Sequence, residues 1–227
     1  MRITIAKNGQ AFDNIAAWKI IGEILRHADG RTTLQFGTGG TTLDICRAAA
    51  QIYAAHPFST ARVCVFGSGE AAGIAHGCLE SWYTILEQAI IKPLKIYEEN
   101  FIMPMPFPDD PVRECRAHES VIAARGGIDL RLVELGDDGA LDLLRPGTPF
   151  GSTAFVEQAD GGTAQMTLGM QNLMHSRRIL LAAKGRGQAE RIRQALQGPV
   201  TEAVPASLLR LHPFLEVVLD RESAALL

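Results

Sequence analysis

Residues 37–42, three glycines and three threonines, are the segment of this sequence with the clearest potential for chemistry. They follow residues 33–36, an apolar run typical of a buried strand, and Thr41 and Thr42 stand where a helix begins. Glycines let backbone N–H groups converge, and a helix N-terminus carries partial positive charge, so this join suits an anion such as phosphate. A tight turn without a ligand has the same composition, and the spacing alone favours neither reading.

This glycine segment matches neither of the common nucleotide-binding signatures. No Gly-Lys-Ser/Thr follows it, which excludes a Walker A loop. Thr42 stands at the third glycine position of G-x-G-x-x-G, which excludes the dinucleotide fingerprint.

Three further glycine-rich breaks also follow apolar runs, at residues 67–69, 136–139 and 185–187. In an open parallel sheet the carboxyl ends of the strands meet at one edge, where ligands bind. The four breaks together therefore predict a pocket. Charged residues beside or near the last three breaks include Glu70, Asp138, Arg145 and Arg186.

The elements that position these loops alternate along the chain. Strands are expected at 2–5, 33–36, 61–66, 128–135, 178–183 and 214–219, with a possible strand at 153–156, and helices at 12–27, 41–55, 82–91, 112–125, 188–196 and 204–209. Residues 103–111 are too rich in proline for a helix and are expected to be a loop. The alternation predicts an α/β fold, an open, mostly parallel sheet with helices on both faces, as a single domain over residues 1–227.

Composition excludes several classes of partner. The chain has 227 residues, 47% of them hydrophobic and 21% charged, which is enough apolar material for a sizeable core. A formal net charge of −3 gives no electrostatic reason to expect nucleic acid or an anionic membrane. The four cysteines lack CxxC or metal-ligand spacing, so we expect reduced thiols, no metal and no cofactor. No signal peptide or membrane span is recognisable, and the expected location is the cytoplasm.

The loops, in this order, resemble those of the glucosamine-6-phosphate deaminase and 6-phosphogluconolactonase superfamily, and most of all its galactosamine-6-phosphate isomerase branch. FGTGGTTL at 36–43 is similar to the TGGTP or TGATP sugar-phosphate loop, and residues 122–136 resemble the segment before the catalytic loop. Asp138-Gly139 matches the DG of the family's NDGH region. TEAVPASLLRLH at 201–212 resembles the C-terminal IPAS–LH signature.

This resemblance implies a fold, a ligand and a reaction. The ligand is a small phosphorylated sugar, a hexose 6-phosphate, and the reaction is ring opening followed by an aldose–ketose proton shift. That reaction needs a carboxylate base and a histidine paired with carboxylates. The implied phosphate-binding residues are Gly37, Thr38, Gly39, Gly40 and Thr41.

The same resemblance implies that the usual catalytic groups are replaced. The base position is Gly69, the ring-opening histidine position is Ala140, and the glutamate before the family's proline is Arg145. The phosphate-binding lysine aligns with Gln188, and residues 146–170 contain no arginine. An acid–base group contributes orders of magnitude to such a reaction, so the standard mechanism is in question.

Four residues remain as substitutes. Glu70 and Asp138 are the candidate catalytic carboxylates, against the simpler readings of a helix N-terminal acid and a turn aspartate. Arg145 and Arg186 are candidates to bind phosphate in place of the lysine, against simple solvent exposure.

Three functions follow from these residues. The first is an amino-sugar-phosphate isomerase or deaminase, with altered chemistry. The second is a catalytically inactive homologue that binds a sugar phosphate or regulates another process. The third is a 6-phosphogluconolactonase, suggested by the GDDG sequence at 136–139. The sequence leaves the oligomeric state and the choice between enzyme and pseudoenzyme open.

Overall fold

The computed structural model describes residues 1–27, 30–152, 155–158 and 164–227. Its centre is a seven-stranded sheet in the order β1-β10-β9-β6-β2-β3-β5, and every pairing in it is parallel. The bounds are β1 Arg2–Ala6, β2 Thr32–Phe36, β3 Val63–Gly67, β5 Phe101–Ile102, β6 Leu130–Glu134, β9 Arg178–Ala183 and β10 Leu215–Asp220. The predicted α/β fold with a parallel sheet is confirmed, and β5 is a strand that the sequence did not predict.

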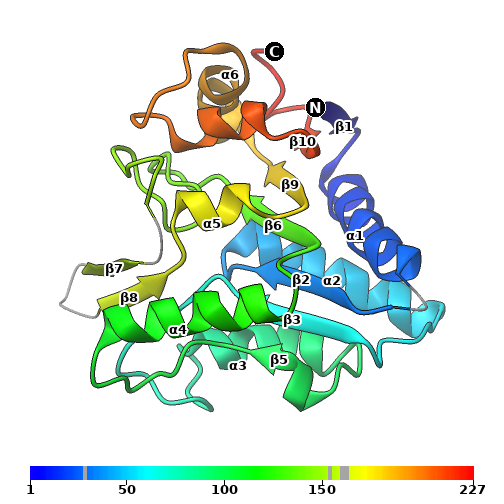
Figure 1. Ribbon diagram of the computed structural model, residues 1–227. Helices are drawn as coiled ribbons and strands as arrows, with labels where there is room; N and C mark the ends of the chain where they lie inside the picture. Colours follow the sequence, from blue (N-terminus) through cyan, green and yellow to red (C-terminus); the bar gives the residue numbers. More distant parts are fainter. Residues whose placement is uncertain (28–29, 153–154, 159–163) are drawn as a thin grey trace.

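Helices cover both faces of this sheet (Figure 1). Their bounds are α1 Gly9–Arg26, α2 Gly40–Ala55, α3 Trp82–Leu86, α4 Pro111–Ala124, α5 Met170–Met174 and α6 Ala189–Gln197. Shorter turns complete the chain: a π-helical turn η1 Glu87–Ile91 and 3-10 turns η2 Glu98–Asn100, η3 Arg186–Gln188 and η4 Pro205–Leu211. The expected helix at 82–91 is thus an α-helical turn that widens into a π-helical one, and the expected helix at 204–209 is 3-10.

Alternation along β9 shows how the two faces are formed. Leu180 and Ala182 join the cluster under α1 and α2, whereas Ile179 and Leu181 join the cluster under α5 and α6. All four side chains are buried, as expected for a central parallel strand covered on both sides.

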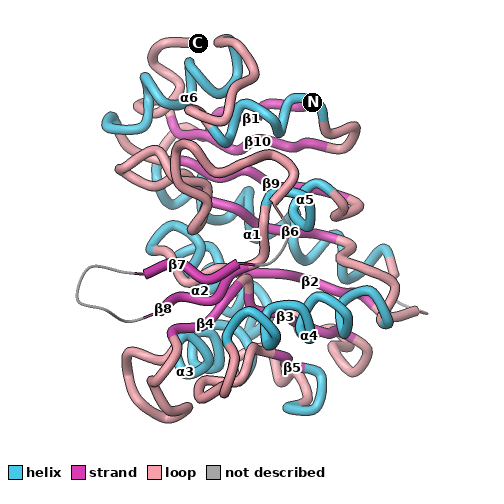
Figure 2. The backbone as a smooth tube through the Cα atoms, turned by 60° about the vertical axis from the view of Figure 1, so that its left-hand side comes forward, coloured by secondary structure: helices cyan, strands magenta, loops and turns pink. Residues whose placement is uncertain are grey.

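A second sheet of three strands extends from the carboxyl end of β3. The sequence predicted only one possible strand in it, at 153–156, of which residues 155–156 belong to β7. Its order is β4-β8-β7, antiparallel, with β4 at Gly69–Ala71, β8 at Ala164–Thr167 and β7 at Phe155–Gln158. Figure 2 shows these strands beside the β2 and β3 side of the main sheet. Of the possible strand at 153–156, residues 153–154 lie outside the described part of the chain.

His118 on α4 is buried against this region, and its Nε2–H donates a hydrogen bond of 3.1 Å to Gly67 O. Burial lowers the pKa of His118 from its ordinary value of 6.5 to about 4. The neutral ring is therefore the form that the fold accommodates.

Acidification is expected to destabilise the protein through His118. The unfolded chain takes up a proton at the ordinary pKa of His118, whereas the folded chain does so only at the lowered pKa. The stability contributed by the neutral ring is therefore present above the ordinary pKa and is lost as the pH falls from the ordinary to the lowered pKa. That difference corresponds to roughly 3 kcal/mol at most. Urea unfolding of the wild type and His118→Gln at neutral and mildly acidic pH measures it. The variant, whose amide does not titrate, should lose less stability, and parallel curves for the two proteins would contradict the expectation.

Candidate functional site

A cavity of about 170 Å³ lies at the carboxyl edge of the main sheet, where ligands bind in folds of this type. Its lining residues are Gly37, Thr38, Gly39, Ser68, Trp82, Glu134, Asp142 and Leu143. They come from the ends of β2, β3 and β6, from α3 and from the segment after β6, at residues 142–143. The predicted pocket therefore exists, but only the first two glycine-rich breaks contribute lining residues to it. The breaks at 136–139 and 185–187 do not line it.

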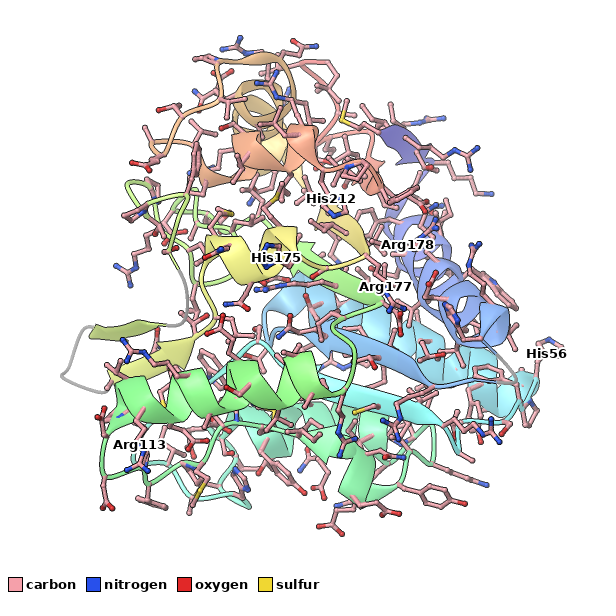
Figure 3. All side chains as sticks on the ribbon, viewed as in Figure 1. His56, Arg113, His175, Arg177, Arg178 and His212 are labelled. Carbon is pink, nitrogen blue, oxygen red and sulfur yellow. The ribbon has the colours of Figure 1, made fainter. Side chains whose placement is uncertain are left out.

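A larger cavity, of about 260 Å³, lies at the opposite edge, where strands begin. Arg178, which Figure 3 shows at the start of β9, lines it together with Lys19 and Glu216. None of the predicted site residues lines this cavity, so we place the candidate site at the carboxyl edge.

Glu134, the last residue of β6, lines the pocket and was missed by sequence reasoning. Its Oε2 accepts a hydrogen bond of 2.8 Å from Thr42 N, at the start of α2. Burial raises the pKa of Glu134, while the Thr42 N–H lowers it. The signal available in the sequence was a charged residue at the end of a buried strand. The structure adds that this strand, β6, pairs with β2, which leads into the glycine loop.

Gly39 leaves the space in which the Glu134 carboxylate lies. A Cβ built on Gly39 would overlap the Glu134 carboxylate. Gly39 is also the N-cap residue of α2 and has no side chain to cap the helix, so the carboxylate of Glu134 takes that role. The glycine loop and Glu134 therefore form one unit.

Asp142, also missed by the sequence reasoning, forms a buried ion pair behind the pocket. Its Oδ2 lies 3.3 Å from Arg131 Nη2, and both side chains are almost completely buried. Its Oδ1 accepts a hydrogen bond of 3.2 Å from Glu134 N. The backbone of Asp142 has φ 53°, a left-handed conformation that aspartate tolerates better than most residues. Burial raises the pKa of Asp142, and the Arg131 guanidinium opposes that rise.

Glu70, a predicted catalytic carboxylate, is fully buried on β4 and does not line the pocket. Its Oε1 accepts hydrogen bonds of 2.9 Å from Ala71 N and Trp82 N, and its Oε2 accepts one of 2.9 Å from Tyr83 N. This geometry is that of an acid at the N-terminus of α3, the simpler reading of the two. A catalytic role for Glu70 stays a prediction.

Asp138, the second predicted carboxylate, points back at its own loop. Its Oδ1 accepts a hydrogen bond of 3.0 Å from Ala140 N, the Asx-turn arrangement. Asp138 itself is exposed and does not line the pocket. The geometry again fits the simpler reading, and its catalytic role stays a prediction.

Gly69, at which the resemblance implied a missing base, is closed in by the second sheet. A Cβ built on Gly69 would overlap Met166 O of β8 and lie 3.1 Å from the Trp82 ring. Gly69 pairs with Thr167 in the antiparallel ladder, so the obstruction is backbone and not a movable side chain. No side chain fits at this position in the observed arrangement.

The basic residues near the pocket do not enter it. Arg145 and Arg186 are exposed, and neither is a lining residue. Lys184 Nζ lies 3.1 Å from Asp13 Oδ1 and 2.7 Å from Asp44 Oδ2, an ion pair that joins β9 to α1 and α2. Phosphate binding by Arg145 or Arg186 stays a prediction.

Gln188, at which the resemblance implied a lysine, is buried and turned toward the preceding glycine-rich break. Its Nε2 donates a hydrogen bond of 2.8 Å to Asp137 Oδ1. The lining residues therefore include two carboxylates, Glu134 and Asp142, and no basic side chain.

Two negative findings apply to the described residues. They contain no group of three or more His, Cys, Asp and Glu side chains placed to hold a metal ion. None of the helices in this part of the chain is long and apolar enough to cross a membrane.

Comparison with known proteins decides the family. The family model for glucosamine-6-phosphate isomerases/6-phosphogluconolactonase matches residues 16–217. The chain belongs to this family. The glucosamine-6-phosphate deaminase of Shouchella clausii is 30% identical over 241 residues, covering 99% of this chain and 97% of that relative.

Solved structures of family members share the fold. A monomeric glucosamine-6-phosphate deaminase of the NagB superfamily matches with a TM-score of 0.94 and 26% identity over 100% of both chains. The 6-phosphogluconolactonase of Trypanosoma cruzi matches with a TM-score of 0.83, at 18% identity, over 99% of this chain and 96% of that one. The family resemblance seen in the sequence is confirmed.

Proposed function

We propose that this protein binds a hexose 6-phosphate, or a close relative of one, at the carboxyl-edge pocket without catalysing the family's aldose–ketose shift. Family membership supports a role in sugar-phosphate metabolism. The main observation against the standard reaction is that the β8 backbone occupies the space which a side chain at position 69 would need. A base cannot be supplied from this position without moving β8.

Two residues outside the pocket lining, Ala140 and Glu70, support the same proposal. Ala140 carries no acid–base group, and the carboxylate oxygens of Glu70 are engaged by the backbone amides of Ala71, Trp82 and Tyr83. A proton transferred at C1 or C2 of a sugar needs a base within hydrogen-bond reach. The resemblance to the galactosamine-6-phosphate isomerase branch makes galactosamine 6-phosphate the first ligand to test, and the cytoplasm is the compartment that we propose for it.

An isomerase or deaminase with altered chemistry is the second candidate. The observation in its favour is that Glu134 and Asp142 both line the pocket and are carboxylates with raised pKa values. A 6-phosphogluconolactonase is the third candidate, and it rests on the GDDG sequence alone.

An activity assay separates the first two candidates. Purified protein is incubated with glucosamine 6-phosphate or galactosamine 6-phosphate, and ammonia release and ketose formation are followed beside an active family deaminase. We expect rates lower by at least about 10³-fold, because general acid–base groups contribute 10²–10⁴-fold. Turnover within tenfold of the active enzyme would refute the proposal. Thermal stabilisation by the phosphorylated sugar, and not by its neutral parent, is the expected sign of binding.

A further inference from the structure

The start of α2 is built as an anion site. Helix α2 spans 16 residues, and its first intrahelical backbone bond runs from Leu43 N to Gly39 O. The amides of Gly40, Thr41 and Thr42 precede that bond and have no partner within the helix. Converging amides at a helix N-terminus favour a negative group, whether it comes from a ligand or from the protein.

The protein itself supplies a negative group here. The Glu134 carboxylate lies on Thr42 N at 2.8 Å, in the space that a side chain at position 39 would fill. Its backbone is fixed from both sides by Asp142: Glu134 N donates to Asp142 Oδ1 at 3.2 Å, and Asp142 N donates to Glu134 O at 3.0 Å. The carboxylate is thus held at the place where the loop would receive a phosphate.

The surrounding charges add to this competition. Asp142 is a second carboxylate on the pocket wall, and its partner Arg131 is buried behind it. Lys184, the basic residue directly after β9, is paired with Asp13 and Asp44. A phosphate entering while Glu134 is in place would meet two carboxylates and no basic lining side chain.

We infer that Glu134 is an internal occupant of the phosphate cradle, which a phosphorylated ligand must displace in order to bind. Glu134 thereby sets the affinity of the pocket for phosphate. This inference rests on the proposed function, because it assumes that the cradle is where the ligand's phosphate binds.

Isothermal titration calorimetry at neutral pH, with glucosamine 6-phosphate and with inorganic phosphate, tests this role. The proteins are the wild type, Glu134→Ala, Glu134→Gln and the control Asp110→Ala. Asp110 caps α4 by accepting hydrogen bonds of 2.9 Å from Val112 N and 3.1 Å from Arg113 N, and it does not line the pocket. The control therefore removes a helix-capping carboxylate without opening the cradle.

Removal of the occupant is expected to raise affinity. Glu134→Ala should bind both ligands at least tenfold more tightly than the wild type, while Asp110→Ala should bind as the wild type does. Glu134→Gln keeps the bulk of the side chain and loses its charge, so its affinity should lie between those of the wild type and Glu134→Ala. Melting temperatures measured without ligand record the loss of the helix cap. If Glu134 were only a structural residue, its removal would lower the melting temperature and would not tighten binding.

The outcomes separate the two proposals. Wild type and Glu134→Ala binding the sugar phosphate with equal affinity would overturn the role of Glu134 and leave the proposed function standing. Loss of binding in Glu134→Ala, with the variant still folded, would also overturn it and would make Glu134 a ligand-binding residue. Failure of both proteins to bind any phosphorylated sugar would overturn the proposed function.

Discussion

Replacing Arg131 with methionine is expected to destabilise the protein by about 3–5 kcal/mol, because the change leaves the Asp142 carboxylate buried and without its counter-charge. Arg131 is 1% exposed and the Asp142 side chain 4%, so water cannot screen the remaining charge. Within the described part of the chain, Nε and Nη1 of Arg131 have no hydrogen-bond partner. The ion pair with Asp142 is therefore the main interaction that offsets the cost of burying the guanidinium. Urea unfolding followed by circular dichroism measures the loss.

A second variant separates the unpaired charge from the loss of packing. Arg131→Met combined with Asp142→Asn removes both charges, and asparagine tolerates the left-handed backbone at position 142. Most of the lost stability should return in the double variant, since a buried ion pair replaced as a pair costs little. Arg193→Met, which breaks a surface pair with Glu190, should have no measurable effect. A double variant as unstable as Arg131→Met would show that packing, and not charge, is responsible.

Replacing Glu70 with alanine is expected to cost about 3 kcal/mol or more, because three backbone amides lose their acceptor at a buried site. Hydrogen bonds to a charged group contribute about 1.5–3 kcal/mol each, and part of that is recovered when water enters the space. The same urea unfolding experiment applies. The matched control is Glu114→Ala, which removes one exposed carboxylate that accepts from Met105 N at 2.8 Å and should cost about 1 kcal/mol.

The result bears on the function as well as the stability. If Glu70 holds α3 in place, Glu70→Gln should be less stable than the wild type, since an amide offers one acceptor oxygen where the carboxylate offers two. Any effect on ligand binding should then follow from the altered start of α3, where Trp82 lines the pocket. Wild-type stability in Glu70→Ala would contradict the capping role and revive Glu70 as a group kept for chemistry.

The sequence was sufficient to predict the main sheet because its central strands are short, apolar and separated by amphipathic helices. Residues 61–66 and 178–183 illustrate this, since each forms an inner strand of the sheet, with a strand on either side, close to its predicted bounds. The small sheet was not predictable in the same way. Strand β4 has three residues and begins with glycine, and it exists because β8 pairs with it from far along the chain.

The sequence predicted where the candidate site lies, but it did not predict which side chains line it. The glycine loop at 37–42 marked the place of the pocket, although its local spacing fits an anion site and a turn without a ligand equally. The contribution of Glu134 depends on β6 lying beside β2 in the sheet, a long-range pairing that no local pattern records. The predicted residues Glu70 and Asp138 were sought for their chemistry, and the structure shows that backbone amides of neighbouring segments bind their carboxylates.

The enclosure of Gly69 has a consequence for the evolutionary history open to this protein. Because Met166 O fills the space of a side chain at position 69, a single substitution there cannot be accepted while β8 keeps its place. A descendant that acquired a carboxylate at this position would first have to accumulate changes that shift β8, because the side chain has no space while β8 keeps its place. The pairing of β4 with β8 therefore puts a carboxylate at position 69 out of reach of any single substitution at that position.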